Sequence, residues 1–130
     1  MKIIDREIPK DILYEDDDTI AFLDIAPTAP GHTLVISKKP CVNVFDTDEA
    51  TWSTVMRTVL KMAPAVRDAV GAKGVQINSN HGAEAGQAVM HLHIHIIPRH
   101  DRSEFEFWPP QQYKDGQEKE IADKIRSQLS

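Results

Sequence analysis

The segment from His91 to Ile97 most constrains the fold, because histidines and aliphatic residues alternate along it. In an extended strand successive side chains point to opposite faces, so His91, His93 and His95 share one face and the aliphatic residues share the other. The segment therefore predicts a strand with a buried aliphatic face. Imidazole titrates near neutral pH, so a row of three suits proton transfer, nucleophilic attack or metal ligation. The alternative is a polar strand face whose histidines only form hydrogen bonds.

The rest of the chain predicts one antiparallel sheet with helices. Short β-rich runs bounded by turn residues indicate four further strands, at 12–15, 19–24, 32–37 and 74–78. Apolar residues at helical spacing indicate a long helix from about 52 to 70, which Pro64 is expected to kink or split. A second, amphipathic helix is expected at 114–129. Together these elements predict an α+β architecture with the long helix across one face of the sheet.

Length, charge and cysteine content limit the function classes. A chain of 130 residues is the size of one domain with its own core. The net charge of −5 disfavours nucleic acid as a partner, and no apolar run is long enough to cross a bilayer. Cys41 is the single cysteine, which excludes an internal disulfide and a multi-cysteine zinc site. The opening residues lack a signal-peptide pattern, so we expect a cytoplasmic protein without nucleic-acid or membrane partners.

Several separated motifs make the chain similar to the histidine triad (HIT) family, whose signature is His-x-His-x-His followed by two apolar residues. Besides the histidine segment, the matching stretches are 2–4, 7–9, 21–25, 29–36, 80–82 and 86–89. The resemblance covers about residues 2–99 of a single domain and leaves about 100–130 as a C-terminal extension. It implies a five-stranded antiparallel sheet that continues across a homodimer. It also implies a hydrolase or nucleotidyl transferase that acts at the α-phosphorus of a purine nucleotide without a cofactor.

The resemblance implies a role for each histidine of the group. His93 resembles the nucleophile, held in one tautomer by a backbone carbonyl. His95 and His32 would contact phosphate oxygens, although His32 alone would be interpreted as a turn residue. His91 would orient the strand. Transferase members carry glutamine at the third position, so His95 points to the hydrolase branch, which acts on purine nucleoside phosphoramidates or dinucleoside polyphosphates.

The resemblance also implies a nucleotide-binding set. Asp24 would accept both ribose hydroxyls, although its position by itself suits a turn former. The base pocket would be lined by four apolar residues that sequence alone assigns to the core: Ile3, Ile8, Phe22 and Ile25. The phosphate would meet amide side chains and closely approaching backbone in the glycine-rich loop, at Asn80, Gly86, Gln87, Ala88 and Val89. Solvation of the loop is the alternative interpretation of its two amides.

Three departures from the family pattern affect the expected chemistry. Zinc-binding relatives open with Cys-x-x-Cys and often carry histidine where this chain has Pro40, so we expect no metal. Ala88 replaces a serine of the purine nucleoside phosphoramidase branch, which removes a hydroxyl donor near the leaving group. Trp108 and the two prolines after it resemble the ending of that branch, but here the chain continues for twenty further residues.

Two other functions stay open on sequence alone. Three histidines can hold zinc, but three in line on one strand match tetrahedral geometry poorly. A nucleotide-binding interaction module with negligible turnover is the other alternative, because family membership does not guarantee a reaction. For the homodimer that the resemblance implies, the candidate contacts are on the long helix, unless they only cover their own sheet: Trp52, Val55, Met56 and Val59.

Overall fold

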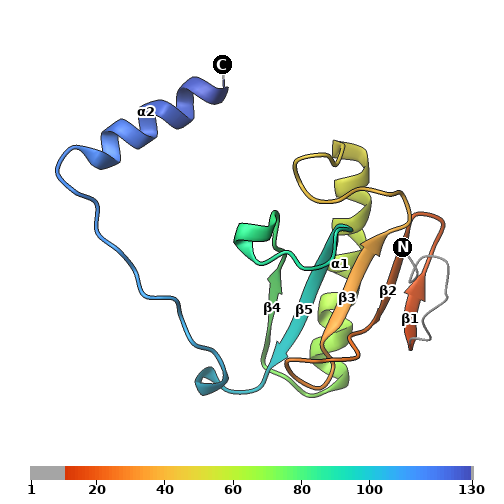
Figure 1. The fold of residues 1–130 in the computed structure, drawn as a ribbon. Coiled ribbons are helices and arrows are strands. Elements are labelled where there is room, and N and C mark those ends of the chain that lie inside the picture. The colour runs from red at the N-terminus through yellow and green to blue at the C-terminus, as the bar shows by residue number, and fades with distance from the viewer. Residues whose placement is uncertain (1–10, 130) are drawn as a thin grey trace.

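Five strands form one antiparallel sheet in the computed structural model, which describes residues 11–129 (Figure 1). The strands are β1 (Ile12–Glu15), β2 (Thr19–Leu23), β3 (Thr33–Ser37), β4 (Gly74–Asn78) and β5 (His93–Arg99). Their spatial order is β1-β2-β3-β5-β4, so β3 and β5 lie in the middle and β4 forms one edge. The α+β architecture expected from sequence is confirmed.

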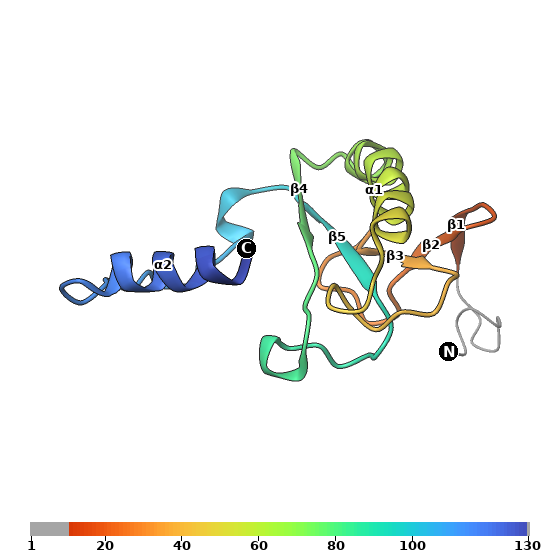
Figure 2. The same cartoon turned by 90° about the horizontal axis from the view of Figure 1, so that it is seen from above.

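One long helix, α1 (Glu49–Ala69), covers one face of the sheet (Figures 1 and 2). Its apolar stripe, including Val55 and Val59, packs on the aliphatic face of β5. Leu92, Ile94 and Ile96 are at most 2 % exposed, which confirms the aliphatic face predicted from their alternation. The histidine face therefore points away from α1, on the open side of the sheet.

Pro64 does not split the helix, because α1 runs without interruption from Glu49 to Ala69. Proline lacks the N–H that would bond to the carbonyl of Leu60. Pro64 is exposed and Leu60 is 75 % exposed, so this carbonyl lies on the solvent side of α1. Water can satisfy a carbonyl there, which is why the sequence tolerates proline inside the helix.

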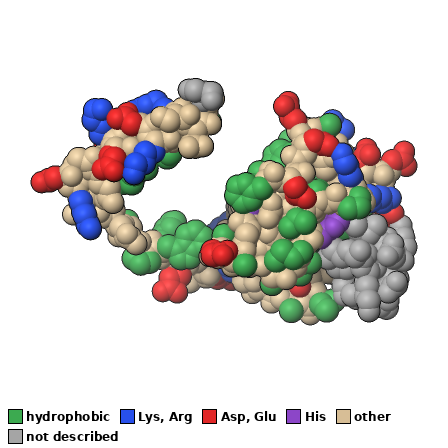
Figure 3. All heavy atoms as spheres, turned by 45° about the horizontal axis from the view of Figure 1, so that its top comes forward, with side chains coloured by type: hydrophobic (Ala, Val, Ile, Leu, Met, Phe, Trp, Pro, Cys, Tyr) green, Lys and Arg blue, Asp and Glu red, His purple; other side chains and the backbone are tan. Residues whose placement is uncertain are grey.

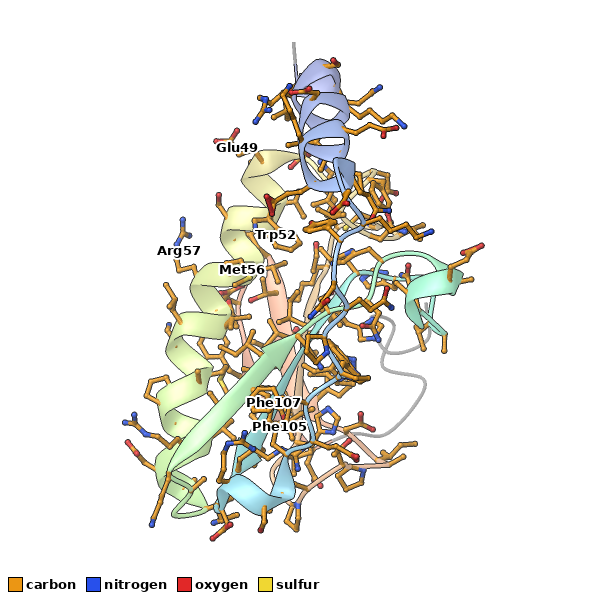
Figure 4. The ribbon with its side chains drawn as sticks, turned by 90° about the vertical axis from the view of Figure 1, so that its left-hand side faces the viewer. Glu49, Trp52, Met56, Arg57, Phe105 and Phe107 are labelled. Atoms are coloured by element: carbon orange, nitrogen blue, oxygen red, sulfur yellow. The ribbon has the colours of Figure 1, made fainter. Side chains whose placement is uncertain are left out.

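Two of the residues named for a dimer contact belong to the protomer's own core. Val55 and Val59 have no exposed surface, so they cover their own sheet and that expectation is wrong for them. Trp52 and Met56 pack against the same cluster but stay partly exposed. Figure 4, viewed toward the β4 side of the sheet, shows both side chains projecting from α1 beside the strands.

The C-terminal extension leaves the sheet after β5. A short 3-10 helix (Arg102–Glu104) follows, then an irregular segment, then α2 (Gln117–Leu129), which starts three residues later than the sequence suggested. Figures 1 and 2 show α2 lying apart from the sheet, and none of its described residues is buried. Acidic and basic side chains are interspersed over its surface (Figure 3). No helix in residues 11–129 is long and apolar enough to cross a membrane.

A second, smaller apolar cluster lies on the open face of the sheet. Ile20 and Phe22 of β2 pair with Ile36 and Leu34 of β3, and cross-strand partners share a face. Phe22 is 1 % exposed and Ile36 is fully buried. Because the histidines of β5 share this face, the cluster forms an apolar floor beside them.

Candidate active site

The histidine row, which consists of His91, His93 and His95, lies on β5 and on the segment just before it. β5 begins at His93, so the expected strand over 91–97 is shifted, and His91 and Leu92 precede it. Leu92 instead donates its N–H to the carbonyl of Cys41 at 2.8 Å. Leu34 of β3 pairs with His95, which places His32, two residues before Leu34, on the same face. His32, which immediately precedes β3, is therefore brought beside the row.

Backbone carbonyls orient His91 and His93. The Nε2 of His91 lies 2.8 Å from the carbonyl oxygen of Ser37, and the Nδ1 of His93 lies 2.7 Å from the carbonyl oxygen of His91. A carbonyl only accepts, so each of these nitrogens carries a proton. Neutral His93 therefore keeps an unprotonated Nε2 with a free lone pair. This geometry matches the carbonyl-fixed tautomer that the sequence led us to expect for a nucleophile.

A chain of hydrogen bonds fixes the tautomers of His32 and His95 as well. The backbone N–H of Thr28 donates to Nδ1 of His32 at 3.0 Å, so that nitrogen has no proton. The proton of neutral His32 then sits on Nε2, which lies 2.9 Å from Nδ1 of His95. His95 accepts at Nδ1 and, when neutral, carries its own proton on Nε2. Two neighbouring rings thus differ: His93 offers a lone pair and His95 offers an N–H donor.

Burial keeps the rings of His32, His91 and His95 neutral near pH 7. Desolvation lowers the pKa of His95 to about 4, with smaller contributions from repulsion by His93 and His32. Desolvation also lowers the pKa of His32, partly opposed by Asp24, and lowers the pKa of His91. For these three rings, the tautomers assigned from the hydrogen bonds are therefore the forms present at neutral pH.

Asp24 follows β2, and its two carboxylate oxygens have different surroundings, one in a backbone turn and one beside a histidine. Its Oδ1 accepts the backbone N–H of Ala26 at 2.9 Å, which is the interaction of a turn former. Its Oδ2 lies 3.7 Å from Nε2 of His32. The turn therefore fixes the carboxylate beside the histidines.

A cavity of about 410 Å³ joins most of the predicted residues. It lies between the row, the end of β2 and the glycine-rich loop. Its lining is Phe22, Asp24, Ile25, Leu34, Asn80, Gly86, Gln87, Ala88, Val89, His93 and His95. Gly86, which lies beside the Asn80 amide, has a φ of 93°, a backbone conformation that residues with a side chain rarely adopt, so the loop favours glycine here. Ile3 and Ile8 lie outside the described residues, and His32 and His91 stand behind the lining.

The side-chain amide of Gln87 is fully engaged in hydrogen bonds to the loop and to residues 42 and 43. Its Oε1 accepts from Asn43 Nδ2 and from the Gly82 N–H, and its Nε2 donates to the carbonyls of Val42 and Val89. All four hydrogen-bonding positions of the carboxamide are thus occupied, and the side chain is 5 % exposed. In this structure the side chain therefore supports the backbone beside the cavity, and a contact of its amide with phosphate stays a prediction.

Several further residues hold the site in place, although they were not among those expected from the sequence. Leu34 lines the cavity, and its place two residues after His32 in the same strand was the available signal. Thr28 and Ser37 act through backbone atoms, which no side-chain pattern reveals. Ser79 donates its hydroxyl to the carbonyl of His93 at 3.0 Å and ties the start of β5 to the segment after β4.

The donor set fits a hydrogen-bonded chain better than a metal centre. Asp24, His32 and His95 bring ligand atoms within 4.8 Å of one another, but His91 and His93 are not in this group. A metal bound to Nε2 of His32 would move the ring proton to Nδ1, against the N–H donor of Thr28. Metal-bound histidines normally donate from the second nitrogen, and here that nitrogen accepts.

The antiparallel sheet, the histidine row on its open face and the glycine-rich loop beside it are the features of a nucleotide-binding class of small α+β domains. Comparison with known protein families leads to the same class. The family model "HIT domain" matches residues 5–102. The chain therefore belongs to the HIT family, and the resemblance seen in the sequence is confirmed.

Individual relatives support this assignment. Protein hit of Bacillus subtilis is 41 % identical over 103 residues, which are 79 % of this chain and 71 % of that protein. The crystal structure of SMU.412c from Streptococcus mutans has a TM-score of 0.91 at 34 % identity, with 99 % of this chain and 83 % of that chain covered. A histidine triad nucleotide-binding protein from Candida albicans has a TM-score of 0.84 at 28 % identity, with 98 % and 94 % covered.

Proposed function

We propose that this protein binds a purine nucleotide in the histidine-lined cavity and hydrolyses it at the α-phosphorus. The substrates would be purine nucleoside phosphoramidates or dinucleoside polyphosphates, and the reaction would pass through a nucleotidyl group on His93. The observation that carries the proposal is the bond from Nδ1 of His93 to the carbonyl of His91, which leaves Nε2 free as a nucleophile in the cavity. The relative from Candida albicans, named as nucleotide-binding, supports the ligand class.

The first chemical step follows from the two tautomers. The lone pair on Nε2 of His93 attacks the α-phosphorus, and the bond from phosphorus to the leaving group breaks. The N–H of His95 hydrogen-bonds to the phosphate or the leaving group and stabilises its developing charge, while His95 itself stays neutral. A polyphosphate departs as an anion, whereas an amine takes its proton from solvent.

The second step releases the nucleotide. Water attacks the same phosphorus, the bond to His93 breaks, and Nε2 regains its lone pair. The proton lost by water passes to solvent. Each displacement inverts the configuration at phosphorus, so the two displacements together retain it.

The remaining lining residues would hold the nucleotide. Phe22, Ile25 and Leu34 provide an apolar surface for the base, and the second carboxylate oxygen of Asp24 is available to ribose hydroxyls. Backbone N–H groups of residues 86–89 would approach the phosphate. Ile25, at 76 % exposure, has most of its side chain available for such a contact.

The proposal includes a homodimer in the cytoplasm. β4 lies at an edge of the sheet, and Ile77 on it is 46 % exposed. Trp52 and Met56 on α1 are partly exposed beside it, so a second copy would cover both the strand edge and these side chains. Cys41, the one cysteine, is buried and unpaired, as suits a reducing compartment.

The decisive experiment combines a variant with a stereochemical measurement. His93→Ala should abolish hydrolysis of adenosine phosphoramidate yet still bind AMP, because the apolar floor and Asp24 remain. A substrate with a chiral α-phosphorothioate should give product of retained configuration in the wild type. Net inversion would show direct attack by water, with His93 acting as a general base.

Two controls separate the alternatives. Dialysis against EDTA should leave turnover unchanged, whereas activity that is lost and then restored by zinc would favour a metal enzyme. Tight binding of AMP by the wild type without turnover of either substrate class would favour a nucleotide-binding module. Ala88 gives this second alternative a structural reason, because the cavity lacks the hydroxyl that the phosphoramidase branch places near the leaving group.

A further inference from the structure

Three cations that form no ion pair within residues 11–129 line one cleft outside the nucleotide cavity. Other lysines and arginines in residues 11–129 form ion pairs, as in Lys38–Glu15 and Arg67–Asp68. Lys73, Arg99 and Arg102 form no such pair with any described residue, yet they surround the same cleft of about 580 Å³. We call it the Arg99 cleft. It is completed by Gly74, Val75, Gln76, His100, Asp101 and Phe105.

Two of the cations are held in place by neutral groups. Nε of Arg99 donates to Oε1 of Gln76 at 2.6 Å, which leaves its two terminal nitrogens available. Gly74 pairs with Arg99 across β4 and β5, and nothing would meet a Cβ on it within 4 Å, so the space beside the guanidinium is open. The guanidinium of Arg102 lies 4.2 Å from the ring centroid of Phe107 and donates to the carbonyl of Phe105. Figure 4 shows Phe105 and Phe107 where the C-terminal segment leaves the sheet.

Two carboxylates lie near the cleft, and both are engaged elsewhere. Oδ1 of Asp101 accepts from the backbone and hydroxyl of Ser103. Oε1 of Glu104 accepts the backbone N–H groups of His100 and Asp101. These donors hold the pKa of both carboxyls below the usual range, so both are charged and reduce the local positive potential. Neither carboxylate forms an ion pair with Lys73, Arg99 or Arg102, although the charge of Arg99 contributes to the lowered pKa of Glu104. The remaining donors of the three cations are therefore available to a ligand, on a protein whose net charge is −5.

The cleft follows the histidine row along the same strand. Arg99 is four residues after His95 on β5, so the two share a face and their Cα atoms are about 13 Å apart. The long arginine side chain shortens this gap. The charge of Arg99 also reaches the row, where it contributes to the lowered pKa of His32. A chain of phosphates that begins at the row is an anion of suitable length and charge for the cleft.

We propose that the Arg99 cleft binds the distal phosphates of the leaving group when the substrate is a dinucleoside polyphosphate. This inference rests on the proposed function and assigns the substrate class more narrowly. Guanidinium and ammonium groups bind phosphate through charge-assisted hydrogen bonds. A phosphoramidate has a small leaving group without distal phosphates, so its turnover does not use the cleft.

The test compares two substrates in four variants. Arg99→Gln, Lys73→Gln and Arg102→Gln each remove one cation of the cleft, and Arg57→Gln removes an exposed cation of α1 as the matched control (Figure 4). Each cleft variant should lower kcat/KM for diadenosine tetraphosphate by about tenfold or more. It should change kcat/KM for adenosine phosphoramidate less than about twofold, and Arg57→Gln should change neither. Equal losses on both substrates, or no loss on the tetraphosphate, would overturn the proposal.

A binding measurement keeps the proposal testable if the protein turns over neither substrate. Inorganic tripolyphosphate titrated calorimetrically into the wild type should bind about tenfold more tightly than into Lys73→Gln or Arg99→Gln. Equal affinities would refute phosphate binding in the Arg99 cleft, whether or not the protein turns over a substrate. Lys73 is exposed and forms no described side-chain bond, so its variant is expected to fold, and size-exclusion chromatography would verify that the assembly is unchanged.

Discussion

At the scale of single residues, the two oxygens of the Asp24 carboxylate separate a structural role from a binding role. Asp24→Ala should weaken AMP binding by about 1.5–3 kcal/mol, the range for hydrogen bonds to a charged group. The same change should affect 2′,3′-dideoxy-AMP much less, because that ligand lacks both ribose hydroxyls. Calorimetric titration of both ligands measures the difference. Equal losses would mean that Asp24 acts through the turn at Ala26.

The histidine tautomers give a prediction that needs no substrate. At pH 7.5, ¹⁵N NMR should find His93 protonated at Nδ1, and His32 and His95 protonated at Nε2, because each ring has one partner of fixed polarity. Thr28→Ala keeps the backbone N–H and should leave the spectra unchanged. Thr28→Pro removes that N–H and should shift the tautomer signals of His32 and His95. A wild-type His32 protonated at Nδ1 would refute the hydrogen-bond chain from Thr28 through His32 to His95.

Sequence could predict the site residues whose side chains carry the chemistry, but not those that act through backbone atoms. His93, His95 and Asp24 follow from motif and alternation, and the structure brings them together. Thr28 contributes an N–H, which every residue type except proline offers, and Ser37 contributes a carbonyl, which every residue type offers. Gln87 was assigned to the ligand because the sequence gives no sign of which backbone carbonyls an amide side chain in a loop donates to.

At the scale of elements, one buried hydroxyl pair joins the long helix to the sheet. Oγ1 of Thr19 on β2 lies 2.6 Å from Oγ1 of Thr58 on α1, and both residues are at most 3 % exposed. A cycle of Thr19→Val, Thr58→Val and the double variant should give a coupling energy of about 0.5–1.5 kcal/mol in urea unfolding. The cycle removes the separate loss of the Thr19 bond to Asp16. A coupling energy near zero would contradict a net contribution from this pair.

The periodicity of the chain predicts which elements exist better than where they end. The alternation of histidines and aliphatic residues predicted β5 and its buried face. The strand nevertheless starts at His93, because His91 bonds to Ser37 and Leu92 bonds to Cys41. Pro64 indicated a break, and only the fold shows that its missing N–H faces solvent. The amphipathic pattern of α2 is present, yet Ile125 and Leu129 are 57 % and 81 % exposed, so pattern alone did not place that face against this sheet.

At the scale of the whole molecule, the buried histidines predict how stability depends on pH. The folded state lowers the pKa of His32, of His91 and of His95, the last to about 4, while the unfolded chain has the ordinary value near 6.5. Between these values the unfolded state binds more protons than the folded state. The free energy of unfolding therefore rises with pH in this window and falls as the solution is acidified.

The expected curve is flat above about pH 7.5 and declines below about pH 6.5, toward pH 4. Each histidine contributes a slope of up to about 1.4 kcal/mol per pH unit, because protonation must overcome burial. The groups that face these rings are the Ser37 carbonyl at His91, and Asp24, His93 and the charge of Arg99 around the other two. Urea unfolding at intervals between pH 4.5 and 8 measures the slope. His91→Asn, which keeps a donor for Ser37 but does not titrate, should reduce it, whereas a slope unchanged in this variant would show that His91 is not among the groups responsible.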